Sequence, residues 1–157
     1  MKAQDVMTRD AQSCRPETSI AQAAVLMWDY DCGALPVVDD SNRVVGMITD
    51  RDIAIAASTK GRLATEITVG EVMSGNVYAC ATDEDIKSAL NTMRREKVRR
   101  LPVISDGGKL AGILSINDFV LRADEARGRQ APEISYEDVI TAFKDVCEHP
   151  RAYQARA

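Results

Sequence analysis

The stretch GMITDRDI, residues 46–53, returns as GILSINDF, residues 112–119. Each contains a glycine, two apolar residues, a hydroxyl residue, two variable positions, an aspartate and an apolar residue. Shifting the sequence against itself by 66 positions aligns the two stretches, and 13 of the 53 positions from 6 to 58 are then identical. Most of these identities are apolar, glycine or proline positions. The sequence therefore indicates a tandem duplication, which determines the expected fold.

Each copy predicts the same order of elements. A short strand at residues 11–15, or 76–80, precedes a helix in which Ile20, Ala24 and Met27 recur at the spacing of one helix face. Two apolar strands joined by a polar turn then predict a hairpin, at 34–49 and again at 100–115. A second helix follows each hairpin. We therefore expect an α/β (α+β) fold of two pseudo-symmetric halves, each with the order strand, helix, strand, strand, helix.

The segments outside the repeat predict two further helices. Thr68 and Glu71 have the spacing of a capping box, which indicates a short helix before the second copy. Residues 123–133 are charged and rich in helix breakers, and are expected to form a linker. Ser135 is a plausible N-cap for an amphipathic C-terminal helix. The expected boundaries are 1–60 for the first half, 61–124 for the second, and 125–157 for the linker and C-terminal helix.

Composition excludes several classes of protein. The chain has 157 residues, 45% of them apolar, and a net charge of −4, so it can form a core but offers no cationic field for nucleic acid or an anionic membrane. No segment has the length and apolar character of a membrane span or a signal peptide. We expect a cytoplasmic protein.

The cysteines carry no metal-binding pattern. Cys14, Cys32, Cys80 and Cys147 form no CxxC pair, and the one histidine of the sequence is His149. We expect reduced and mostly buried thiols, and no metal requirement.

The hydroxyl and the aspartate of the repeated phrase form the candidate binding motif. Thr49 and Asp52, and again Ser115 and Asp118, lie where a strand becomes a helix. Helix N-termini favour anions, and a carboxylate can accept two hydrogen bonds from a ribose diol. The simpler interpretation is a helix cap, which such residues usually form. The recurrence of the whole phrase at constant spacing favours a ribose phosphate site.

Taken together, these motifs are similar to those of a known family. DVMTRD and GEVMSG, GALPVVDD and RRLPVISD, and GMITDRD and GILSIND each occur once per copy. Each half resembles a CBS domain, and the two together resemble a Bateman module of the stand-alone type, over residues 4 to 123. The resemblance implies two halves that pack through their sheets, clefts that bind adenosine-containing ligands, and a flat homodimer.

The resemblance also implies which residues line the clefts. One cleft is lined by Asp118, Ser115 and Ile113 of the second half, and the first half contributes Thr8, Gln12, Cys32, Gly33 and Ala34. The other takes Asp52, Thr49 and Met47, faced by Ser74, Tyr78, Val98 and Arg99.

The two clefts are not expected to be equivalent. Arg99 and Arg100 stand where the first copy has Gly33 and Ala34, and either arginine could bind phosphate. Between its hydroxyl and its aspartate the first copy has Asp50 and Arg51, where the second copy has the uncharged Ile116 and Asn117. Arg51 is therefore a second candidate for binding phosphate, while Asp50 would repel an anion. We expect the Asp118 cleft to bind more tightly.

Two competing functions have weaker support. RREKVRR, residues 94–100, could bind nucleic acid, but a solvated helix end explains it better in an acidic chain without interleaved aromatic residues. Catalysis is not expected, because no phosphate loop, metalloprotease motif or nucleophile elbow is present. Trp28 is expected to be a core or interface residue.

The sequence therefore predicts a regulatory module, not an enzyme. The resemblance implies that it binds AMP, ADP or ATP, with S-adenosylmethionine ranked behind them, and we expect it to signal by conformational change to an unidentified protein partner. We expect a homodimer, with Trp28 and the apolar helix faces as candidate interface, and neither membrane nor nucleic acid as partner. The alternative is a ligand-free scaffold that uses its C-terminal helix for docking.

Overall fold

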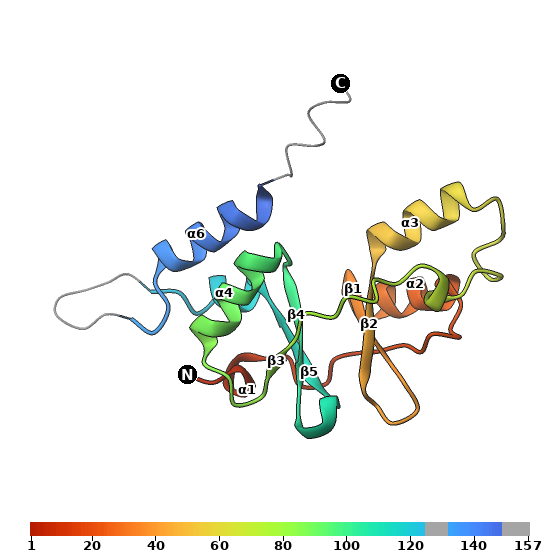
Figure 1. Ribbon diagram of the computed structural model, residues 1–157. Coiled ribbons are helices and arrows are strands. Elements are labelled where there is room, and N and C mark those ends of the chain that lie inside the picture. Colours follow the sequence, from red (N-terminus) through yellow and green to blue (C-terminus); the bar gives the residue numbers. More distant parts are fainter. Residues whose placement is uncertain (125–131, 149–157) are drawn as a thin grey trace. The chain divides into compact units, whose positions relative to one another are not determined.

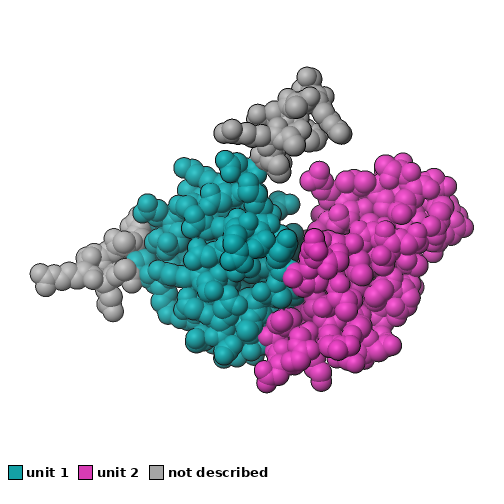
Figure 2. All heavy atoms as spheres, viewed as in Figure 1, with its two compact units in different colours: residues 1–9, 78–103, 112–157 teal, residues 10–77, 104–111 magenta. Residues whose placement is uncertain are grey.

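The computed structural model describes residues 1–124 and 132–148 and divides the chain into two compact units. Unit 1 contains residues 1–9, 78–103 and 112–157, and unit 2 contains residues 10–77 and 104–111 (Figure 2). His149 and residues 125–131 of the expected linker lie outside the described part. The mixture of helices and strands in two repeats, followed by a C-terminal helix, confirms the predicted fold class.

Unit 2 is built on the first β-hairpin. Its strands are antiparallel, with Ala34 opposite Thr49 and Leu35 opposite Ile48, and the two main helices lie on the same side of them (Figure 1). Cys14 forms a single parallel bridge to Val37 where a short strand was predicted. The elements are α2 (Ile20–Asp29), β1 (Ala34–Val38), β2 (Val44–Thr49), α3 (Asp50–Thr59), the 3-10 helix η1 (Val69–Glu71) and, at the tip of the second hairpin, η2 (Asp106–Gly108).

Unit 1 repeats this plan with a three-stranded sheet in the order β3-β4-β5. The second hairpin begins in unit 1, and its tip at residues 104–111 groups with unit 2. The elements are α1 (Ala3–Val6), β3 (Cys80–Ala81), α4 (Ile86–Glu96), β4 (Arg100–Ile104), β5 (Leu110–Ser115), α5 (Ile116–Val120) and α6 (Tyr136–Cys147).

Local signals in the sequence explain where the helices begin and end. Ser19 accepts a hydrogen bond from the Gln22 N–H at the start of α2, and Asp85 accepts one from the Lys87 N–H at the start of α4. Such caps satisfy backbone donors that the first turn leaves without a partner. Lys97 adopts a left-handed conformation and ends α4, as a C-terminal cap commonly does.

Each repeat contributes one extended segment to the unit of the other repeat. In unit 1, Thr8 of the first copy bridges Ile113 on β5, and in unit 2, Ser74 of the second copy bridges Met47 on β2. The repeated glycine makes this approach possible: a Cβ on Gly112 would lie 2.6 Å from the Thr8 carbonyl oxygen. A Cβ on Gly46 would lie 2.5 Å from the Met73 Sδ. The glycine of the repeated phrase is thus required by a neighbouring chain segment.

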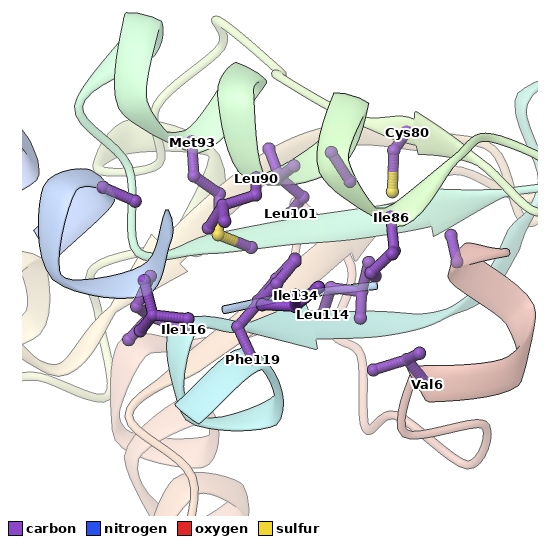
Figure 3. Packing of buried hydrophobic residues seen from close by; sticks show 14 of the residues in the cluster. Val6, Cys80, Ile86, Leu90, Met93, Leu101, Leu114, Ile116, Phe119 and Ile134 are labelled. Atoms are coloured by element: carbon purple, nitrogen blue, oxygen red, sulfur yellow. The ribbon is translucent and has the colours of Figure 1, made fainter. Parts of the chain in front are cut away.

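Each unit has its own apolar core. In unit 1, Met93, Leu90 and Ile86 of α4 point toward Leu101 and Leu114 on the strands (Figure 3). In unit 2, the fully buried large side chains are Ile20, Leu35, Val37, Ile48, Ile67 and Val69. Trp28 belongs to neither core, since 86% of its surface is exposed. Of the two roles expected for Trp28, the core role is therefore excluded, and the interface role stays a prediction.

The C-terminal helix α6 lies alongside α4 in unit 1 and confirms the predicted amphipathic helix (Figure 1). Ser135 caps it by accepting from the Asp138 N–H. Arg94 on α4 donates from Nε to Asp145 at 2.8 Å, and Lys97 Nζ donates to the Glu148 carbonyl at 3.1 Å. Its buried residues are Ile134, just before the helix, Val139 and Ala142.

The cysteines meet the expectation only in part. Cys14 and Cys80 are buried, Cys32 is half-buried and Cys147 is exposed. Burial raises the pKa of Cys14 to about 11 and that of Cys80 to about 12. These two thiols stay protonated at neutral pH.

Within residues 1–124 and 132–148, no helix combines the length and apolar character that a membrane span requires.

Candidate functional site

The first candidate site is the start of α3 in unit 2. Thr49 and Asp52 form a capping box: the Asp52 Oδ2 accepts from the Thr49 N–H at 2.9 Å and from the Thr49 hydroxyl at 2.6 Å, while Thr49 Oγ1 accepts from the Asp52 N–H at 3.2 Å. Both side chains are half-buried. The aspartate is therefore held in one orientation, and its Oδ1 accepts no hydrogen bond from the described part of the chain.

The second candidate site is the start of α5 in unit 1, and its geometry is nearly the same. Asp118 Oδ2 accepts from the Ser115 N–H at 2.7 Å and from the Ser115 hydroxyl at 2.8 Å. Both side chains are again half-buried, and Oδ1 of Asp118 is likewise without a donor among the described residues. In each carboxylate, Oδ2 therefore serves the fold, and Oδ1 has no donor among the described residues.

A third box of the same kind shows what this geometry alone does not establish. At the start of α6, outside the repeat, Asp138 Oδ2 accepts from the Ser135 N–H at 3.0 Å and from its hydroxyl at 2.9 Å. The pKa of Asp138 is lowered from its usual value of 3.8, chiefly by the hydrogen bond from the Ser135 backbone and also by the one from the Ser135 hydroxyl. Burial alone would raise this pKa, but its effect is smaller. The capping interpretation is therefore confirmed for all three boxes, and binding at the two repeated ones must be argued from their surroundings.

The two segments that each repeat contributes to the unit of the other, at Thr8 and at Ser74, are called the exchanged segments, and they pair with the strands that lead into the two repeated boxes. Met47 and Ser74 exchange backbone hydrogen bonds of 3.1 and 2.9 Å, and Thr8 and Ile113 exchange two bonds of 3.0 Å. The structure thus brings together the predicted pairs Met47 with Ser74 and Ile113 with Thr8. Ser74 and Thr8 are exposed, so their hydroxyls are accessible next to each box.

The loops before β1 and β4 lie against the box of their own repeat. The Gly33 carbonyl accepts from the Asp50 N–H at 3.2 Å, and the Arg99 carbonyl accepts from the Ile116 N–H at 2.9 Å. The antiparallel hairpin explains both contacts, because the start of its first strand lies beside the end of its second. Each contact lies within one unit, and the expectation that Gly33 faces Asp118 and Arg99 faces Asp52 stays a prediction.

Three arginines near the boxes have no acidic partner among the described residues. Arg99 is exposed before β4, Arg100 is half-buried at its start, and Arg51 is exposed on the first turn of α3. Unpaired guanidinium groups are suited to bidentate binding of phosphate. Arg99 and Arg100 belong to the unit of Asp118, and Arg51 to that of Asp52.

The remaining predicted site residues lie farther from the boxes along the chain. Gln12 and Cys32 are half-buried in unit 2, and the Cys32 N–H donates to the Met27 carbonyl after α2. Val98 packs against the core of unit 1, and Tyr78 is exposed before β3. Ala34 is buried and pairs with Thr49 on the neighbouring strand.

The basic run 94–100 is divided between structural roles. Arg94 and Lys97 hold α6, and Arg95 Nε lies 2.6 Å from Glu96. Helix α4 ends at Glu96 and strand β4 begins at Arg100, so the run spans a helix end and the following strand, as the alternative to a nucleic-acid patch predicted.

Comparison with known proteins identifies the family. The model of the CBS domain matches residues 3–58 and 69–125. The chain belongs to the CBS domain family. This confirms the resemblance, and the two matches are the two copies of the repeat. Among similar proteins, CBS domain-containing protein YhcV of Bacillus subtilis is 32% identical over 137 residues, which cover 86% of this chain and 96% of that one.

Two further relatives show what CBS proteins can hold. Hypoxic response protein 1 of Mycobacterium tuberculosis is 34% identical over 123 residues, covering 78% of this chain and 85% of that one. A crystal structure of Hypoxic Response Protein I with two coordinated zinc ions is similar, with a TM-score of 0.72, 33% identity, and coverage of 79% of this chain and all of that one. The CBS domain pair of protein MJ0100, in complex with 5′-methylthioadenosine and S-adenosylmethionine, has a TM-score of 0.70, 26% identity, and coverage of 77% and 94%.

These structures correct the expectation about cofactors. The sequence predicted a nucleotide without a metal and ranked S-adenosylmethionine behind AMP, ADP and ATP. That prediction is wrong, because a similar CBS protein coordinates zinc and another binds S-adenosylmethionine. Within the described ranges, no three His, Cys, Asp or Glu side chains gather into a group that could hold a metal ion.

The chain is also similar to an enzyme, but the match covers only about a fifth of the length of that enzyme. Inosine-5′-monophosphate dehydrogenase of Mycobacterium tuberculosis is 32% identical over 114 residues, which cover 73% of this chain and 21% of the enzyme.

Proposed function

We propose that the chain is a regulatory module that binds adenosine-containing small molecules at the helix starts marked by Asp52 and Asp118. At each site the carboxylate has Oδ2 held by its own cap and Oδ1 without a donor among the described residues. A ribose diol can donate to such an oxygen. The observation that carries the proposal is what distinguishes these two boxes from the one at Asp138: an exposed hydroxyl residue of the other repeat, Ser74 or Thr8, is hydrogen-bonded to the strand that leads into each box. A similar CBS domain pair binds two ligands that contain adenosine, which supports this ligand class.

The two sites differ in charge and therefore in the ligand that each favours. Arg99 and Arg100 make the Asp118 site suitable for a phosphorylated adenosine such as AMP or ATP. Asp50 adds a second carboxylate beside Asp52, which disfavours phosphate and favours an uncharged or cationic ligand such as S-adenosylmethionine. We place the tighter nucleotide site at Asp118, in agreement with the expectation from the sequence.

Binding would act on a partner protein and not through catalysis. A ligand that bridges the carboxylate of a box and the exposed hydroxyl of the exchanged segment would favour one conformation of that unit. The shift in population is limited by the difference in the affinity of the ligand for the two conformations. A cytoplasmic location and a homodimer remain part of this proposal.

Isothermal titration calorimetry with AMP, ATP, S-adenosylmethionine and 5′-methylthioadenosine, each with and without Zn²⁺, tests the proposal. We expect heat for at least one ligand, and we expect Asp118→Asn to weaken nucleotide binding by about tenfold or more, since a charge-assisted hydrogen bond contributes roughly 1.5–3 kcal/mol. Asparagine keeps an oxygen for the cap, so the helix start is preserved.

The third box supplies a matched control. Asp138→Asn makes the same change in the same local geometry outside the repeat, and affinity should not change. If no ligand in the panel binds, the proposal is wrong. If Asp138→Asn lowers affinity as much as Asp118→Asn, the assignment of the site is wrong.

A further inference from the structure

The turn after α4 contains a lysine in a conformation that usually favours glycine. Lys97 has a φ of 55° and a ψ of 41°, in the left-handed region. The Val98 N–H donates to the Met93 carbonyl at 3.0 Å, and the Lys97 N–H donates to the Arg94 carbonyl at 3.3 Å. These two bonds form a Schellman motif, in which the left-handed residue is usually glycine. A lysine there carries backbone strain that glycine would avoid.

The first copy of the repeat has the same turn with a different residue in it. Asp31, 66 positions before Lys97, has a φ of 48°, and the Cys32 N–H donates to the Met27 carbonyl at 2.9 Å. Aspartate enters the left-handed region more readily than lysine, because its short side chain can form local hydrogen bonds. The shape of the turn therefore does not explain the lysine of the second copy.

The side chain of Lys97 explains its presence, because it reaches the end of α6. Its Nζ donates to the Glu148 carbonyl at 3.1 Å and to Glu148 Oε2 at 3.4 Å. A cation at the C-terminal end of a helix is favourable. In the last turn of α4, Arg94 Nε donates to Asp145 Oδ2 at 2.8 Å, where α4 and α6 lie side by side (Figure 1). The end of α4 thus holds the end of α6.

The apolar contact of α6 is narrow, so these polar contacts matter for its docking. Within the helix only Val139 and Ala142 are buried. They adjoin an exposed stripe of Tyr136, Ile140 and Phe143. Elements with few buried apolar contacts open more readily than the rest of a fold. The docking of α6 is therefore an equilibrium that a modest free energy can shift.

The same turn leads directly to the Asp118 box. Two residues after Lys97, the Arg99 carbonyl accepts from the N–H of Ile116, the first residue of α5, at 2.9 Å. Asp118 lies on that first turn of α5 and closes the box with Ser115. A backbone segment of three residues, 97–99, thus connects the contact with α6 to the candidate ligand site, and all of these residues belong to unit 1.

We propose that Lys97 is a positioning residue that couples the docking of α6 to ligand binding at the Asp118 site, so that each stabilises the other. Docked α6 holds the turn, and a ligand then binds to a box that is already ordered. Helix α6 becomes the element that reports occupation of this site. The Asp52 site lacks such a connection, since the Asp31 side chain makes no hydrogen bond or ion pair within the described chain. The inference rests on the proposed function, because it concerns the regulation of that site.

Hydrogen exchange of the unliganded chain tests the connection itself. Lys97→Asn removes the ammonium group and keeps a residue that tolerates the left-handed turn. Without the hold on α6, the peptide 112–119 should exchange faster, by about two- to fivefold, as expected for loss of an exposed charged contact. The corresponding peptide 46–53 of the other unit is the internal reference and should not change. A purely local role of the turn predicts the opposite, since asparagine relieves its strain.

A charge exchange supplies the rescue. Arg94→Glu places two carboxylates opposite each other and should accelerate exchange of the peptide 112–119. Adding Asp145→Arg restores a pair of opposite charges and should restore slow exchange. A double variant that exchanges as fast as Arg94→Glu alone would overturn the connection.

Calorimetry and hydrogen exchange with AMP test the coupling to the ligand. Lys97→Asn should weaken AMP binding by about two- to fivefold. At saturation, AMP should slow the exchange of α6 in the unmodified chain and do so less in Lys97→Asn, as reciprocity requires. Asp138→Asn, at the opposite end of α6, is the matched control and should leave the affinity unchanged.

The outcomes separate this inference from the function on which it rests. If AMP binds and Lys97→Asn changes neither its affinity nor the protection of α6, the coupling is wrong and the proposed function stands. If AMP does not bind the unmodified chain, the nucleotide assignment of the Asp118 site is wrong and the coupling falls with it. Unchanged or slower exchange of the peptide 112–119 in unliganded Lys97→Asn would overturn the coupling whether or not AMP binds.

Discussion

Thr8 and Ile113 belong to different repeats, yet each donates a backbone hydrogen bond of 3.0 Å to the carbonyl of the other. Met47 and Ser74 form the corresponding pair in the other unit, with bonds of 3.1 and 2.9 Å. Each unit is thus completed by a segment from the opposite repeat. The repeated glycine, the repeated Met and the binding motif that follows are parts of this one arrangement.

Substitution of the repeated glycine should destabilise the chain. In Gly112→Ala the new Cβ would lie 2.6 Å from the Thr8 carbonyl oxygen, so the exchanged segment must shift, at a cost of about 1–3 kcal/mol in the free energy of unfolding. Urea denaturation measures the loss. Gly75→Ala is the matched control, because no atom lies within 4 Å of the added Cβ. Equal stability of the two variants would contradict the close approach.

Acid should weaken the start of α6. The pKa of Asp138 is lowered in the folded chain from its usual 3.8, so its stabilising contribution is present above about pH 4 and is lost as the pH falls through that value toward the folded pKa. Asp138→Asn should therefore reduce stability at neutral pH, and the difference from the unmodified chain should shrink in acid. A constant difference for Asp138→Asn at all pH values would contradict the assignment.

The two faces of α6 should respond differently to a charge. Val139→Glu places a carboxylate at a buried position against α4, so hydrogen exchange should show that both helices lose protection. Ile140→Glu, one residue away on the exposed stripe, should leave the exchange of α4 unchanged. If both variants expose α4 equally, the division of α6 into an inner and an outer face is wrong.

The thiols should differ in reactivity. Burial raises the pKa of Cys14 to about 11 and of Cys80 to about 12, whereas Cys147 is exposed at the end of α6. Brief alkylation of the native chain, followed by peptide mapping, should label Cys147 well before the two buried thiols. Denaturant should abolish the difference. Early labelling of Cys80 in native conditions would contradict its burial.

Much of this fold could be predicted because its signals are local. The alignment of the two copies placed both hairpins and their helices, and Ser135 indicated the start of α6. The proximity of Thr8 to Ile113 and of Ser74 to Met47 was expected only from the family resemblance, because neither Thr8 nor Ile113 carries a local pattern that indicates a partner so distant in sequence. The contact of Gly33 with Asp50 follows from hairpin geometry, because the start of the first strand lies beside the end of the second.

The exchanged segments also bear on how such a chain can be inherited. A gene that lost one repeat would encode a hairpin without its neighbouring strand, with the space beside Gly46 or Gly112 unfilled and backbone donors exposed at a sheet edge. Selection would then act on the pair as one heritable unit. Once the exchange of segments was established, the ancestral duplication could no longer be reversed by a simple deletion.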